Sequence, residues 1–270
     1  MTLLSPPRTI AIAALVMTLI AGCTPHDPTK VSRDGIFDPY EARNRQVHEK
    51  SKNFDKSIVR SVAVGYAETV PEPAQEMVEN FADNLSVPSA VVNQVLQADL
   101  GGAFKNTVRF GLNSTLGFAG IFDVAGEFGL HEDDADFGQT LAVWGVREGA
   151  YLEMPIIGPT TERDLFGQVV DLVIDPMNAV PRPEAYYLKA ARITAKVGKR
   201  GRYASSVDSV LYDSADSYAQ TRLLYLQNRR YEIGQTDVAG AGGGAGGEEI
   251  DPYAELYGGE IDPYEDLYGE

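Results

Sequence analysis

Apolar residues recur at helical spacing along most of this 270-residue chain. Between residues 74 and 85 they fall at i, i+3, i+4, i+7, i+8 and i+11, which is one face of an α-helix. Similar stripes occupy residues 91–96, 104–112, 165–173 and about 203–231. The pattern predicts an all-α fold built from several short amphipathic helices with Pro and Gly breaks.

Prolines set the expected limits of these helices. Pro71 and Pro73 suit the opening of the first predicted helix, and Pro88 should break or kink the chain. The pair Asp175-Pro176 is expected to end the helix that carries the stripe at 165–173. Residues 150–155 are the single, weak strand candidate.

The predicted stripes have two possible uses, and periodicity does not choose between them. Most amphipathic helices cover a protein core, but a protein held against a bilayer can lay such faces in the interface. The polar faces of these stripes lack basic residues, which argues against purely electrostatic membrane binding. The net charge of −16 likewise excludes the basic surface of a nucleic-acid-binding protein.

The N-terminus predicts an anchored lipoprotein. Arg8 precedes the apolar run IAIAALVMTLIAG, which is followed by Cys23, the only cysteine of the chain. Ile20-Ala21-Gly22-Cys23 resembles a bacterial lipobox, so we expect residues 1–22 to be a signal peptide and Cys23 to be the lipid attachment site. The alternative is an ordinary secretory signal with a buried cysteine. Thr24 in place of an aspartate favours sorting to the outer membrane in lipoproteins of the enterobacterial type.

Composition divides the remaining chain into three parts. Residues 23–37 read as a polar, lipidated tether, and residues 38–232 as the helical domain. Residues 233–270 are Gly-rich and then acidic, with an 11-residue repeat, EIDPYAELYGG followed by EIDPYEDLYGE. This tail carries no apolar run long enough to bury, so we expect it to be disordered and to attract a basic partner in the periplasm.

No catalytic or metal-binding constellation is evident. The match to G-x-G-x-x-G at 242–247 has no strand before it and no helix after it. Ser114 sits in G-x-x-S-x-x-G rather than in a nucleophile elbow, and a hydrolase would need His131 as its base. The acidic run HEDDAD at 131–136 lacks calcium-loop spacing and reads as a solvated loop. We therefore expect no enzyme activity, no cofactor and no metal, with a lipid hydrolase using Ser114 as the alternative.

Residues 110–122 form a glycine-laced apolar segment without charge. Thirteen residues are too few to span a bilayer as a helix, and three glycines disfavour a continuous helix. Such a segment fits a tight, apolar-walled passage and fits a turn in a protein core nearly as well.

Several stretches together resemble the MlaA (VacJ) family of outer-membrane phospholipid-transport lipoproteins. They are DPYEARNR (38–45), PEPAQEMVENFADNLSVPSAVVNQVLQAD (71–99), RFGLNSTLGFAGIFDVAG (109–126), FGQTLAVWGV (137–146), MPIIGPTTERD (154–164) and VDSVLYDSADSYAQTRLLYLQNRR (207–230). The resemblance spans essentially the whole predicted helical domain, whereas the acidic repeat is not part of the family pattern.

The resemblance implies a fold and a function. Members of this family form a ring of mostly horizontal amphipathic helices in the periplasmic leaflet of the outer membrane, around a central pore. Mislocalised phospholipids pass through it to a soluble periplasmic shuttle, which maintains lipid asymmetry, and the protein associates with trimeric porins. A purely structural, porin-associated lipoprotein is a further alternative.

A polar-lined passage would lower the cost of moving a lipid headgroup through hydrocarbon. The candidate lining residues are Asn113, Ser114, Thr115 and Gln139. Each of these side chains could equally cap a helix end or satisfy a backbone group.

Overall fold

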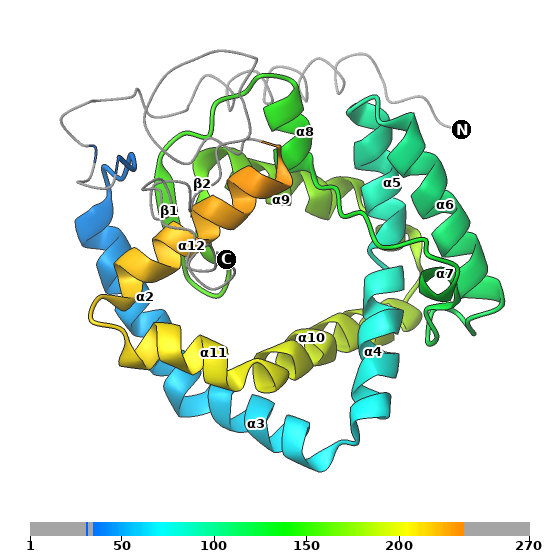
Figure 1. Ribbon diagram of the computed structural model, residues 1–270, viewed down its shortest axis with the longest axis horizontal. Helices are drawn as coiled ribbons and strands as arrows, with labels where there is room; N and C mark the ends of the chain where they lie inside the picture. The colour runs from blue at the N-terminus through cyan, green and yellow to red at the C-terminus, as the bar shows by residue number, and fades with distance from the viewer. Residues whose placement is uncertain (1–30, 32–34, 235–270) are drawn as a thin grey trace, which may run out of the picture. The chain divides into compact units, whose positions relative to one another are not determined.

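The computed structural model describes residue 31 and residues 35–234, and most of these residues are helical (Figure 1). The expected signal peptide, Cys23 and the acidic repeat lie outside the described residues. The first helices are α2 (Glu41–Phe54), the π-helical turn η2 (Asp55–Val59), α3 (Arg60–Thr69), α4 (Glu72–Asn84), α5 (Val87–Leu96), α6 (Leu100–Thr115), α7 (Val124–Glu127) and α8 (Phe137–Val143). A hairpin of β1 (Tyr151–Met154) and β2 (Gly158–Thr161) is followed by α9 (Glu162–Ile174), the 3-10 turn η3 (Pro176–Ala179), α10 (Glu184–Arg202), α11 (Ala204–Asp208), the π-helical turn η4 (Ser209–Asp213) and α12 (Ser217–Glu232).

The prediction of an all-α fold with Pro and Gly breaks is confirmed. Pro71 immediately precedes α4, and Pro88 lies in the first turn of α5, where its missing N–H costs no helical hydrogen bond. Asp99 begins α6 by accepting a hydrogen bond from the Gly102 amide. α9 ends before Asp175-Pro176, as the sequence predicts.

The prediction of one long helix over 203–231 is wrong. The chain leaves the helical conformation at Ser214, and α12 begins afresh with Asp216 as its N-cap. Asp216 accepts a hydrogen bond from the Ala219 amide, and the Ser214 hydroxyl donates to the Val210 carbonyl. The apolar stripe continues through this break, so periodicity hid it, although capping residues at 213–217 offered a local signal.

The expected strand is present as β1, and its partner β2 was not predicted. The two strands pair antiparallel, with Tyr151 opposite Thr161 and Met154 opposite Gly158. The small apolar core lies beside this hairpin and consists of Ile36, Tyr151, Tyr218 and Leu226. The rings of Tyr151 and Tyr218 meet edge to face at 5.9 Å, which ties α12 to the hairpin.

Contacts between neighbouring elements close a circuit within the described chain (Figure 1). From α3 it passes to α10, α4, α6, α5, α8 and α9, and then through β2 and β1 to α2, which leads by η2 back to α3. None of the helices in the described part of the chain is long and apolar enough to cross a membrane.

Candidate functional site

Large apolar side chains are exposed on many of the described elements. Leu100 and Phe104, one turn apart on α6, are 70% and 72% exposed, and Leu172 and Val173 on α9 are similarly open. We call the following set the apolar outer surface: Phe54, Ile58, Val62, Leu100, Phe104, Phe118, Ile156, Val169, Leu172 and Val173. Soluble monomers rarely expose this many large apolar side chains. The apolar outer surface therefore indicates contact with an apolar partner.

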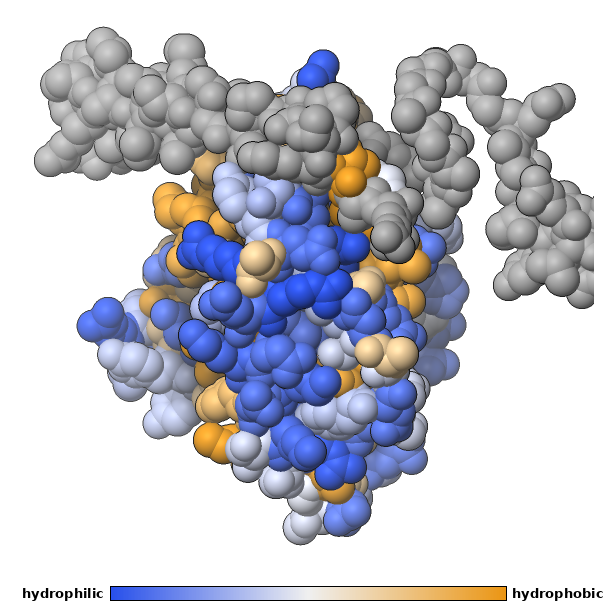
Figure 2. All heavy atoms as spheres, turned by 90° about the vertical axis from the view of Figure 1, so that its left-hand side faces the viewer, coloured by the Kyte–Doolittle hydropathy of each residue, from blue (hydrophilic) through white to orange (hydrophobic). Residues whose placement is uncertain are grey.

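The apolar outer surface does not extend over every element. Figure 2 shows the side of the molecule that carries α2, where hydrophilic residues occupy the middle and hydrophobic residues gather towards the edges. The exposed residues of α2 include Arg43, Gln46, Glu49 and Lys50. The described chain therefore has both a water-compatible face and apolar faces.

In contrast to the apolar outer surface, the buried side chains are mostly polar. Among the residues that the structure describes, more of the buried side chains are polar or charged than apolar. Asn93, which is fully buried, donates to Asp171 at 2.9 Å and accepts from Thr140 at 3.1 Å. Asn106 donates to the buried Gln94 at 2.9 Å. In each of these contacts a buried polar group bonds to another polar group, and the distribution of polar and apolar side chains is inverted relative to a water-soluble globule.

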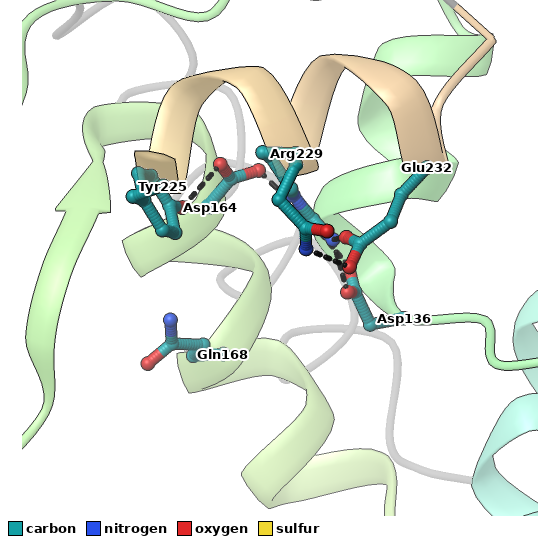
Figure 3. A pocket seen from close by; sticks show the side chains of 7 residues that line it. Asp136, Asp164, Gln168, Tyr225, Arg229 and Glu232 are labelled. Carbon is teal, nitrogen blue, oxygen red and sulfur yellow. Dashed lines mark hydrogen bonds and ion pairs between the residues drawn. The ribbon is translucent and has the colours of Figure 1, made fainter. Parts of the chain in front are cut away.

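Arg229 forms the centre of a pocket of about 170 Å³ that is lined by α12, α9 and the N-cap of α8 (Figure 3). Its guanidinium group lies 2.7 Å from Asp136, 3.1 Å from Asp164 and 3.0 Å from Glu232. HEDDAD forms a loop, as the sequence predicts, and Asp136 at the end of this loop pairs with Arg229 and caps α8. With every carboxylate of the pocket bonded to Arg229, the arrangement is a clamp between helices and holds no nucleophile activated by a base.

Charge pairing controls the ionisation of Asp164 in this clamp. Burial alone would raise the pKa of this carboxyl, but the guanidinium groups of Arg229 and Arg163 hold its pKa below the usual value. Tyr225 donates its hydroxyl to the same carboxylate at 2.8 Å, and burial raises the pKa of that hydroxyl.

We predict that Asp164→Asn lowers the free energy of unfolding by about 2 kcal/mol at pH 7. A carboxyl whose pKa is lower in the folded state stabilises the protein above the unfolded pKa, about 3.9, and this contribution is lost as pH falls through the folded value. The difference between the urea midpoints of the parent and the variant should therefore begin to shrink below about pH 4. If the difference between the two urea midpoints stays constant from pH 7 to pH 3, the pairing with arginine does not hold Asp164 ionised.

The glycine-laced segment ends α6 and then turns sharply. α6 stops at Thr115, and Phe118, Ala119 and Gly120 follow with left-handed φ angles of 52°, 63° and 95°. A Cβ atom on Gly120 would lie 2.4 Å from the Asn84 Cβ, so this position requires glycine. Asn84 also donates to the Ala119 carbonyl at 3.3 Å, which holds the turn against α4.

Three of the four candidate lining residues are adjacent on α6. Asn113 is buried, donates to Asp123 at 2.8 Å, accepts from the Ala125 amide at 2.8 Å, and borders a pocket of about 30 Å³. The Ser114 hydroxyl accepts from Asn84 at 3.2 Å, and the Thr115 hydroxyl donates to the Gly111 carbonyl at 2.6 Å.

Gln139, the fourth candidate, is buried on α8, a helix that packs against α9 and α5. Its backbone amide donates to the Asp136 carboxylate at 2.9 Å. The structure therefore brings Asn113, Ser114 and Thr115 together and places Gln139 on a different helix. Within residues 35–234 no cluster of three His, Cys, Asp or Glu residues could hold a metal ion.

The motif DPYEARNR lies in a second buried polar cluster, which local sequence patterns did not reveal. Asp38 lies 2.7 Å from Arg222 and accepts from the Tyr218 hydroxyl at 2.5 Å. Asn44 donates to Asp38 at 2.9 Å and to the Tyr151 carbonyl at 3.1 Å. This cluster joins the start of α2 to α12 and the hairpin.

Comparisons with known proteins agree on one family. The family model described as MlaA lipoprotein matches residues 36–232. An uncharacterized protein of Rickettsia bellii is 35% identical over 205 residues, which is 73% of this chain and 77% of the relative. The intermembrane phospholipid transport system lipoprotein MlaA of Escherichia coli K12 is 32% identical, with 82% of this chain and 87% of the relative covered.

A solved structure from work on the structural basis for maintenance of bacterial outer membrane lipid asymmetry matches the fold. Its TM-score is 0.64 at 31% sequence identity, and the match covers 73% of this chain and 98% of that chain.

Proposed function

Since this chain belongs to the MlaA lipoprotein family, we propose that it carries phospholipids from the outer membrane towards the periplasm and so maintains lipid asymmetry. The single observation that supports this most is the inverted distribution of side chains, with apolar residues outside and hydrogen-bonded polar residues inside. The relatives from Shigella flexneri and Escherichia coli K12, each covered over 87% of its length, are named for intermembrane phospholipid transport.

The proposed position is the periplasmic leaflet of the outer membrane. Burying one large apolar side chain of the apolar outer surface in acyl chains stabilises the seated protein by about 1.5–3 kcal/mol. The hydrophilic face over α2 would then remain in water (Figure 2). We infer that residues 1–22 serve as the signal peptide, that Cys23 carries the lipid and that residues 38–232 act in transport. At the end of the expected tether, residues 23–37, Ile36 already belongs to the apolar core.

The proposed passage runs through the polar interior. A lipid headgroup that crosses hydrocarbon without hydrogen-bonding partners costs several kcal/mol, roughly, and polar side chains lower this cost. We infer that Asn113, Ser114, Thr115 and Gln139 contribute to the lining; support for Asn113 comes from its position beside the pocket of about 30 Å³. The receiving partner is a soluble periplasmic shuttle, and trimeric porins are the membrane partners.

A cellular assay tests this function. An Escherichia coli strain that lacks its own MlaA would express this chain, and a membrane-impermeant amine reagent would label phosphatidylethanolamine in the outer leaflet. The chain is expected to lower the labelled fraction, while Cys23→Ala, which cannot be lipidated, should not. Labelling at the empty-vector level, with the parent chain present in the outer membrane, would argue against the proposal.

We predict that Ser114→Ala leaves phospholipid passage within about twofold of the parent. The Ser114 hydroxyl accepts a hydrogen bond from Asn84, and in the described residues no histidine is bonded to it, so no base is placed to activate it. Mass spectrometry of the lipid after incubation checks this. Lyso-phospholipid made by the parent and absent with the variant would establish the alternative, a hydrolase.

A further inference from the structure

α10 concentrates positive charge in an otherwise acidic protein. Residues 182–202 contain seven basic residues and one acidic residue, whereas the whole chain has a net charge of −16. This helix is absent from the predicted stripes, so the expectation that their polar faces lack basic residues did not cover it. Its charge needs a separate explanation.

Four of these basic residues serve the fold. Arg192 pairs with Asp175 at 2.8 Å, Arg200 pairs with both Asp55 and Asp208 at 2.8 Å, and Lys199 and Arg202 pair with Glu79 at 3.3 and 3.0 Å. These pairs connect α10 to its neighbours.

Beside these paired residues α10 also carries exposed side chains, with Arg192 three residues after Lys189 and four before Lys196. At 100° per residue, Tyr186, Lys189, Ile193 and Lys196 lie within one narrow face, and all four are exposed. Within residues 35–234, Lys189 and Lys196 have no recorded ion pair. We call these four residues the α10 face.

Packing fixes the direction of the α10 face. α10 contacts α3 and α4, and a Cβ atom on Gly201 would lie 2.2 Å from the Ala63 carbonyl oxygen, so the helix backbone approaches α3 closely on that side. The α10 face lies on the side of the helix away from the buried Ala195 and Gly198.

We propose that the α10 face binds the headgroups of anionic phospholipids and so gives the protein a preference for that lipid class. Aromatic and aliphatic side chains beside lysines are the composition of a helix that lies in a membrane interface. Tyr186 and Ile193 would enter the headgroup and acyl boundary, while Lys189 and Lys196, two turns and about 10 Å apart, would reach two phosphates. This inference rests on the proposed position of the protein in a bilayer. It adds a preference for anionic phospholipids, which that position alone does not require.

Lipid retention on the full-length, lipidated protein tests the inference. The protein would be placed in nanodiscs with equal amounts of phosphatidylglycerol and phosphatidylethanolamine, and native mass spectrometry would count the bound lipids. The parent is expected to retain phosphatidylglycerol about tenfold over phosphatidylethanolamine, since each lysine near an anionic surface adds several-fold. The double variant Lys189→Glu/Lys196→Glu should retain the two lipids about equally.

A matched control separates this site from net charge. Lys50→Glu/Arg147→Glu makes the same charge change at two other exposed positions and should keep the parent ratio. The proposal would be overturned if the α10 variant kept the parent ratio of bound phosphatidylglycerol to phosphatidylethanolamine. It would also be overturned if both variants lowered this ratio equally. Phosphatidylglycerol binding that appears only after residues 240–270 are removed would overturn it as well, because an acidic segment would then be the occupant. Transfer of phosphatidylethanolamine, measured in parallel, reports on the proposed function independently.

Discussion

Replacing Asp38 by asparagine is expected to lower the free energy of unfolding by about 3–5 kcal/mol. The side chain of Asp38 is fully buried against Arg222, whose side chain is only 2% exposed. Neutralising the carboxylate leaves the guanidinium charge in the interior without its nearest counter-charge, and the Tyr218 hydroxyl loses a charged acceptor. Urea denaturation in mild detergent, followed by near-UV circular dichroism, measures the change.

The same two helices provide a control for this prediction. Arg45 on α2 pairs with Asp216, the N-cap of α12, at 2.8 Å, but both side chains are about 40% exposed or more. Asp216→Asn keeps a good N-cap and removes only a solvated pair, so its cost should stay below about 1 kcal/mol. Equal losses in the two variants would mean that burial does not set the strength of the Asp38 pair.

Placing two aspartates on the apolar outer surface is expected to reduce phospholipid transfer at least about tenfold. In Leu100→Asp/Phe104→Asp, each charge at membrane depth costs about 2.5–3.5 kcal/mol, which opposes seating in the leaflet. Because both parent side chains are exposed, the fold itself should be little affected. Transfer from proteoliposomes to a lipid acceptor, with circular dichroism as the folding check, measures the effect.

The control for this variant carries the same two aspartates on the hydrophilic face over α2. Gln46 and Lys50 are exposed there, and Gln46→Asp/Lys50→Asp should transfer lipid at nearly the parent rate. Equal transfer by the two double variants would contradict the proposed contact between the apolar outer surface and acyl chains.

Local periodicity predicted helices that carry an apolar stripe, although in α9 this stripe is exposed or half-buried and the buried residues are Arg163, Asp164 and Gly167. The stripes at 74–85 and 165–173 became α4 and α9, and Pro88 marked the start of α5. α2 and α10 escaped this reasoning because the buried sides of these helices carry Asn44, His48, Ala195 and glycines rather than an apolar stripe. In a fold with a polar interior, the apolar side of a helix no longer identifies its buried side.

The buried ion pairs could not be predicted for another reason. Asp38 meets Arg222, and Arg229 meets Asp136, across more than 90 intervening positions, and no spacing rule connects such residues. The glycine-laced segment was easier to interpret, since a sharp turn after a helix needs left-handed backbone at Gly120. The motif DPYEARNR identified the family, but only the structure shows that Asp38 and Asn44 are joined to α12 and β1.

The most direct test of phospholipid transport is transfer from the purified protein to its periplasmic acceptor. The lipidated chain would be extracted from membranes in mild detergent, reconstituted with labelled phospholipid, and mixed with a delipidated periplasmic shuttle protein. We predict that the shuttle acquires intact phospholipid, and that the rate with Ser114→Ala is within about twofold of the parent rate. A shuttle that stays empty, or one that receives fatty acid or lyso-phospholipid instead, would contradict the account of this protein as a passage for phospholipids.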